Sequence, residues 1–222
     1  MKALKFTVLL YLVITYTSCK DTKFLDCCID IDGYDHNMYL SFQDSSGNDL
    51  VKGIGFYARD SEIGEYVTGK EEDESGWVNN DLFYLEYVYP DEIQNIWKSE
   101  RGSVYDYPKE IYLVKGKKVA ETYPEFGNYD RLFFTTGSPK MYHTSSGKFI
   151  EVPFAEKIIF RFTCPYVFGD NKAHDIVTWW KPHDNKNASR ALCYQIEFEG
   201  KEYTPITYNS SAISFATIIL NR

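Results

Sequence analysis

The sequence predicts an all-β protein, built as an antiparallel β-sandwich with at most one short helix. From residue 24 onward, apolar and polar residues alternate with a period of two, which is typical of strands with one buried face. Clusters of turn-forming residues recur between these segments at intervals of roughly ten residues, as in sandwiches and barrels. Aromatic residues, which favour strands, are frequent, with 19 Tyr, 15 Phe and 4 Trp.

The strands can be placed in order from this alternation. Residues 24–31 form the first, because Cys27, Ile29 and Ile31 share one face while acidic residues share the other. Residues 38–44 form the next predicted strand, which ends in a turn at 45–49. Two hairpins are predicted at 110–123 and 194–206, each with a Gly between extended runs. The other predicted strands cover 53–58, 65–69, 81–90, 131–137, 157–164, 175–180 and 212–220.

A single short helix is predicted at residues 90–99. Pro90 begins it, acidic residues occupy its first turn, and Ile93, Ile96 and Trp97 follow at helical spacing. The acidic segment 69–76 is interpreted as a solvated loop rather than a calcium site. No internal repeat or long linker divides the chain, so one β-domain is favoured over two halves separated near 135–148.

The first 18 residues are typical of a secretory signal peptide. Lys2 and Lys5 supply positive charge, residues 6–14 are apolar, and small polar residues come next. The apolar core is too short to span a bilayer, which takes roughly 20 residues. Removing the segment lowers the net charge from −8 to −10 because it carries two lysines and no acid. A chain this acidic lacks the basic surface that is typical of a nucleic-acid-binding protein.

The end of this segment, Tyr16-Thr17-Ser18-Cys19, resembles the lipobox of Bacteroidetes-type lipoproteins, although Tyr16 stands where Leu is usual. The resemblance implies cleavage before Cys19 and acylation of its thiol and amine, which gives the multiple chains needed for stable anchoring. Lys20, in place of the Asp of lipoproteins kept at the inner membrane, implies the outer membrane, on its periplasmic side or at the cell surface. Segment 41–54, "SFQDSSGNDLVKGI", resembles the Ig-like sandwiches of such lipoproteins. The expected organisation is therefore a signal peptide at 1–18, a lipidated tether at 19–23 and a β-sandwich at 24–222.

Motifs for catalysis or metal binding are missing from the sequence. No Cys-x-x-Cys, His-Glu-x-x-His, nucleophile elbow or phosphate-binding Gly-rich loop occurs. His174 and His183 could form a metal site with Asp170 or Asp175, but surface or hydrogen-bonding roles are the favoured interpretation of these histidines. Segment 30–35 is better explained as a tight turn than as a calcium loop. We therefore expect no cofactor, no metal and no enzymatic activity. Paired carboxylates leave no local signature, so a small hydrolase stays an alternative.

The most distinctive pair of residues is Trp179 and Trp180. Neighbouring side chains of a strand point to opposite faces, so one indole is expected in the core and the other outside. An exposed Trp could stack on a sugar ring, which makes both residues candidates for ligand binding. The alternative is that both indoles are packed.

If Cys19 carries lipid, four cysteines remain, and an oxidising envelope favours disulfides among them. Strand phase places Cys27 and Cys164 toward the core and Cys28 and Cys193 on the other face. It therefore predicts the pairs Cys27–Cys164 and Cys28–Cys193, with a single Cys164–Cys193 bridge as the alternative.

Together these features predict a lipid-anchored, non-catalytic binding module of the cell envelope. Its expected partners are the membrane, through the lipid, and a glycan or another envelope protein. An adhesive or assembly subunit that binds another protein is the alternative function.

Overall fold

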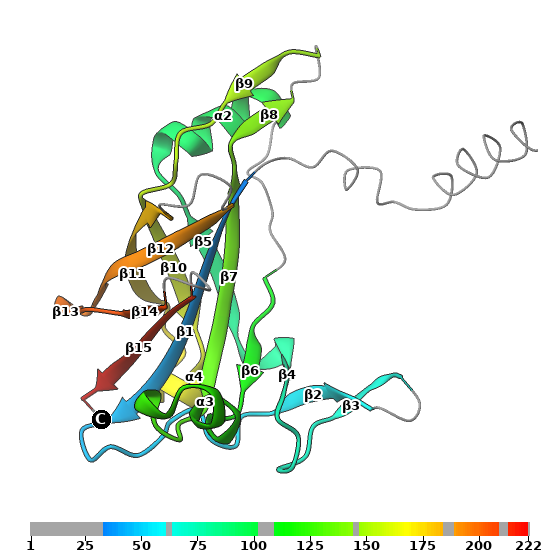
Figure 1. The fold of residues 1–222 in the computed structure, drawn as a ribbon, viewed down its shortest axis with the longest axis vertical. Coiled ribbons are helices and arrows are strands. Elements are labelled where there is room, and N and C mark those ends of the chain that lie inside the picture. Colours follow the sequence, from blue (N-terminus) through cyan, green and yellow to red (C-terminus); the bar gives the residue numbers. More distant parts are fainter. Residues whose placement is uncertain are drawn as a thin grey trace, which may run out of the picture. The chain divides into compact units, whose positions relative to one another are not determined.

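The computed structural model describes residues 33–60, 64–101, 109–143, 147–183, 189–208 and 213–221. Residues 32–222 form one compact unit, and most of its described residues lie in strands (Figure 1), which confirms the all-β class. The predicted strand at 24–31, with Cys27 and Cys28, and the predicted lipidation site Cys19 lie outside the described residues.

Two sheets account for the described strands. The large sheet has the order β3-β2-β4-β6-β7-β1-β12-β11-β10-β5, with β13 beside β12, β15 beside β1, and β14 beside β15. β8 and β9 pair only with each other. The strands are β1 (Gly33–Asp44), β2 (Phe56–Arg59), β3 (Tyr66–Thr68), β4 (Ser75–Val78), β5 (Tyr84–Val88), β6 (Tyr112–Val114), β7 (Arg131–Pro139), β8 (Met141–His143), β9 (Phe149–Glu151), β10 (Lys157–Thr163), β11 (His174–Pro182), β12 (Arg190–Phe198), β13 (Lys201–Tyr203), β14 (Ile206–Tyr208) and β15 (Ile213–Leu220).

The large sheet is mixed rather than antiparallel, and β1 is the reason. It runs antiparallel to β7 on one side and parallel to two strands on the other, first β12 and then β15. Where β12 and β15 diverge, side-chain hydroxyls replace the missing strand partner. The Cys193 N–H donates to Ser214 Oγ at 3.1 Å, and Thr207 Oγ1 donates to the Cys193 carbonyl at 3.1 Å. The backbone N–H and carbonyl of Cys193 are therefore both hydrogen-bonded at the point where β12 and β15 separate.

The expected pair of facing sheets is replaced by one sheet that bends back on itself. In a flat sheet, β7 and β10 would lie four strand spacings, about 19 Å, apart. However, the ring centroids of Phe134 on β7 and Phe160 on β10 are 5.7 Å apart. Tyr87 of β5 also donates its hydroxyl to the Thr135 carbonyl of β7 at 3.0 Å. Two halves of one sheet thus enclose the core, as two sheets do in a sandwich.

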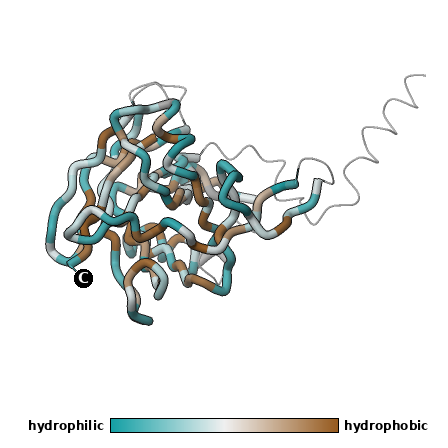
Figure 2. The backbone as a smooth tube through the Cα atoms, turned by 90° about the horizontal axis from the view of Figure 1, so that it is seen from below, coloured by the Kyte–Doolittle hydropathy of each residue, from teal (hydrophilic) through white to brown (hydrophobic). Residues whose placement is uncertain are grey.

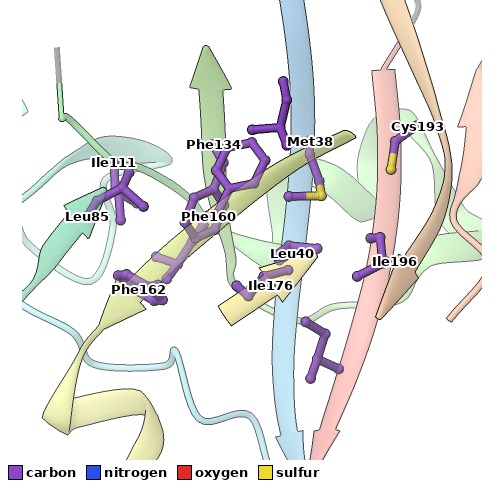
Figure 3. Close-up of a cluster of buried hydrophobic side chains, with 14 of the residues drawn as sticks. Met38, Leu40, Leu85, Ile111, Phe134, Phe160, Phe162, Ile176, Cys193 and Ile196 are labelled. Atoms are coloured by element: carbon purple, nitrogen blue, oxygen red, sulfur yellow. The ribbon is translucent and has the colours of Figure 1, made fainter. Parts of the chain in front are cut away.

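The core lies between these halves (Figure 3) and follows the alternation of the strands. On β1, Met38, Leu40 and Phe42 are fully buried. Hydrophilic residues concentrate in the outer loops (Figure 2). The predicted helix is confirmed as α2 (Asp91–Arg101), which buries Ile93 and Trp97 against the core. Helices α3 (Gly116–Thr122) and α4 (Pro165–Phe168) and the 3₁₀ turns η1 (Asn80–Leu82) and η2 (Pro124–Phe126) were not expected.

Of the two predicted hairpins, one is confirmed and one is wrong. β12 and β13 pair through a turn at Glu199 and Gly200, whose φ values of 50° and 75° match a two-residue hairpin turn. At 110–123, β6 is followed by α3 instead of a second strand. The first turn of α3 is held by Asp130, whose Oδ1 accepts the Gly116 N–H at 2.9 Å. That contact comes from a residue 14 positions away, which the local pattern does not reveal.

A cluster of aromatic rings covers the other face of β1. Tyr39 pairs in register with Phe133 and with Phe215, at centroid distances of 4.6 and 4.9 Å. Phe126 of η2 stacks on Phe215 at 4.1 Å, and Tyr123 packs beside it. Because these rings pack against one another, they stabilise the sheet by cross-strand contact rather than offering open ring faces to a ligand.

Candidate functional site

The two tryptophans of β11 lie on opposite faces, as their spacing predicted. Trp180 is 1% exposed, and its Nε1 donates to Thr178 Oγ1 at 2.6 Å. Its ring packs edge-on against His36, with the centroids 5.0 Å apart. Trp179 faces outward and is half-buried. Of the two candidate ligand-binding residues, only Trp179 therefore has a surface that a ligand can reach.

An irregularity in the neighbouring strand adds an exposed aromatic residue next to the strand partner of Trp179. Trp179 pairs with Gln195 and Trp180 with Cys193, so Tyr194 is an extra residue on β12. Such a β-bulge bends its strand and re-aims a side chain. Tyr194 is 46% exposed, which places its ring outside the core.

Polar side chains border these rings. Lys157 of β10 pairs with Trp179, and its Nζ lies over the indole ring, 5.4 Å from the ring centre. Gln195 pairs with Trp179 from the other side. We call Trp179, Tyr194, Gln195 and Lys157 the Trp179 patch. It combines the half-buried indole of Trp179 and the exposed ring of Tyr194 with an amide and an ammonium group. The sequence pattern indicated only Trp179.

The same bulge changes the position of a cysteine. Strand phase placed Cys193 away from the core, yet it is fully buried together with Ile196 and Phe198. The extra residue at Tyr194 shifts the alternation by one, so Cys193 before the bulge and Ile196 after it both reach the core. Cys164 is also buried, as expected.

Neither predicted disulfide scheme is seen for Cys164 and Cys193, because both are free thiols. Burial raises the pKa of the Cys164 thiol, and it raises that of Cys193 to about 12. Protonated, enclosed thiols are poor nucleophiles, so neither is suited to covalent catalysis.

His174 makes a carboxylate–imidazole–carboxylate chain. Its Nε2 lies 2.9 Å from Asp170 and its Nδ1 3.2 Å from Glu199, and its ring stacks on Phe168. Hydrogen bonding to His174 lowers the pKa of Asp170. These contacts link the loop before β11 to the turn between β12 and β13.

The proposed metal ligands are not brought together. His174 begins β11 and His183 follows its last residue, a separation on the order of 30 Å along the strand. Asp175 instead forms an ion pair with Arg161, at 2.8 Å. Within the ranges that the structure describes, no group of three His, Cys, Asp or Glu side chains could hold a metal ion.

A pocket of about 400 Å³ lies between the acidic loop and α3. All of its lining side chains are polar or charged. They are residues 71–74 of the loop, Lys115, Lys117, Lys118 and Glu121 at α3, and Asp49, Lys52, Asn128 and Asp130. The segment interpreted as a solvated loop is thus one wall of a pocket.

The floor of this pocket is a fixed polar network. Lys115 and Asp130 form an ion pair at 3.0 Å, and each side chain is about 10% exposed (10% and 11%). The Asp130 N–H donates to Asp49 Oδ2 at 2.7 Å, while Asp49 Oδ1 accepts the N–H groups of Val51 and Lys52. Burial raises the pKa of Asp49.

Paired acids of this kind would be needed by the small hydrolase that the sequence left open. Here each oxygen of Asp49 and Asp130 already accepts a hydrogen bond, from a backbone N–H or from the Lys115 ammonium. These hydrogen bonds hold both carboxylates in place and join the loop at Asp49 to the first turn of α3.

In the described part of the chain, no helix has the length and apolar character required to cross a membrane. No family model, no curated protein and no solved structure matches this chain.

Proposed function

We propose that this protein is a lipid-anchored, non-catalytic binding module of the cell envelope that binds a glycan at the Trp179 patch. The observation that carries the proposal is the β-bulge at Tyr194, which leaves an exposed ring next to Gln195, the cross-strand partner of Trp179. The lipid anchor at Cys19 and the outer-membrane location are supported by the resemblance of residues 16–19 to a lipobox.

The chemistry of the patch suits a sugar. The C–H faces of a pyranose are apolar, so they pack on aromatic rings, and rigid Trp and Tyr side chains give this contact at a low cost in conformational entropy. Gln195 can both donate to and accept from sugar hydroxyls, and Lys157 can donate. Because the chain is acidic, with a net charge of −8 that becomes −10 once residues 1–18 are removed, polyanionic ligands are disfavoured.

A glycan array with the purified full-length protein, followed by calorimetry on the best ligand, tests this proposal. We expect Trp179→Ala to weaken the affinity about fivefold or more, since an aromatic contact contributes about 1 kcal/mol or more. Tyr194→Ala should weaken it by a smaller factor. The matched control is Tyr84→Ala, because Tyr84 is 55% exposed on β5 and lies outside the patch. Equal affinity in the wild type and in Trp179→Ala would contradict the proposal.

The anchor is tested separately. Palmitate labelling in cells should mark the wild type and leave Cys19→Ala unlabelled and unprocessed. Labelling of the variant would show that Cys19 is not the acylated residue.

A further inference from the structure

The polar pocket at α3 is a second place where a ligand can bind, and it shares no residue with the Trp179 patch. Its volume of about 400 Å³ lies within the range of known ligand sites. Those sites are mostly lined by hydrophobic side chains. This pocket has none, so a ligand with a large apolar surface would gain little from entering it.

The charges of the pocket further restrict the chemical class of ligand that it can bind. Four lysines and seven carboxylates line it, which gives a net charge of −3. Phosphates and other strong anions would be repelled, and the four lysines oppose a compact polycation. No side-chain triad suitable for a metal occurs among the residues that the structure describes.

The floor is ordered before any ligand arrives. Lys115 and Asp130 are held to each other, and Asp49 is held by three backbone N–H groups. The walls, by contrast, carry exposed carboxylates such as Glu71, whose side chain is 80% exposed, and one exposed amide, Asn128. Wall groups of this kind can accept and donate hydrogen bonds in several directions at once.

We infer that this pocket binds a neutral, polyhydroxylated molecule of monosaccharide to disaccharide size. Such a ligand offers hydroxyls that both donate and accept, which matches a lining of carboxylates, ammonium groups and one amide. It carries no charge for the net negative lining to repel. The inference adds a second sugar site to the proposed glycan-binding function, and it depends on the pocket residues alone.

The test titrates the full-length protein with galactose, mannose, N-acetylglucosamine and their disaccharides, observed by saturation-transfer NMR and calorimetry. Galacturonic acid and spermidine serve as charged probes. We expect saturable binding of at least one neutral sugar, and at least tenfold weaker binding of galacturonic acid than of galactose at pH 7. The double variant Glu71→Ala with Asn128→Ala should bind the neutral sugar at least tenfold more weakly than the wild type.

Two controls separate this site from the Trp179 patch. Glu202→Ala removes the same charge as Glu71→Ala from an exposed position on β13, outside the pocket, and should leave the affinity unchanged. Trp179→Ala should also leave pocket binding unchanged, whereas it weakens binding at the patch. Absence of saturable binding by every neutral sugar would overturn the inference, and so would tighter binding of galacturonic acid or spermidine. It would also be overturned if the double variant kept the wild-type affinity.

Discussion

The buried ion pair between Lys115 and Asp130 gives the sharpest prediction about stability. Its atoms are 3.0 Å apart, and both side chains are about nine-tenths buried, at 10% and 11% exposure. Removing one partner leaves the other charge buried, which costs about 3–5 kcal/mol. Lys115→Met should therefore lower the free energy of unfolding by about 3 kcal/mol or more. Asp130→Asn should cost about 3 kcal/mol, since the exposed carboxylate of Glu71, 3.9 Å from the Lys115 ammonium, compensates only weakly.

The double variant is the decisive measurement. With both charges removed, no uncompensated ion is left, so Lys115→Met with Asp130→Asn should lie within about 2 kcal/mol of the wild type. Urea unfolding followed by Trp fluorescence gives these values, and an unchanged m-value shows that the same transition is compared. If the two single losses simply add in the double variant, the residues are not energetically coupled and the reasoning is refuted.

Three further predictions follow from buried side chains. Burial lowers the pKa of His36 from 6.5 to about 4. The unfolded chain therefore takes up a proton at this residue below pH 6.5, whereas the folded protein takes it up only near pH 4. Stability should therefore fall by about 2 kcal/mol between pH 7 and pH 5 through this group, and His36→Gln should reduce the measured loss by that amount. Cys164 and Cys193 should react with a thiol reagent only after unfolding, and a disulfide-linked Cys164 peptide in non-reducing mass mapping would contradict this. Phe215→Ala should cost about 3–5 kcal/mol in urea unfolding, because the ring is 4% exposed between Tyr39 and Phe126, and a loss below about 1 kcal/mol would show that this cluster does not support the sheet.

The local pattern of the sequence was enough for the features that depend on neighbouring residues. Alternation with a period of two placed most strands, and it placed Trp179 and Trp180 on opposite faces. Helical spacing of Ile93 and Trp97 identified α2. These predictions held because the direction of a side chain within a strand or helix is set by the backbone geometry of that element alone.

The tertiary structure decided the features that depend on residues far apart in the chain. The bulge at Tyr194 is defined by pairing with β11, and it reversed the expected face of Cys193. The parallel partners of β1 and the replacement of a strand by α3 depend on similarly distant contacts. The polar pocket draws its lining from residues between Asp49 and Asp130, which are brought together by the fold. A sequence pattern records which face a residue takes within its own strand, but strand register and neighbours are chosen by the packing of the whole sheet.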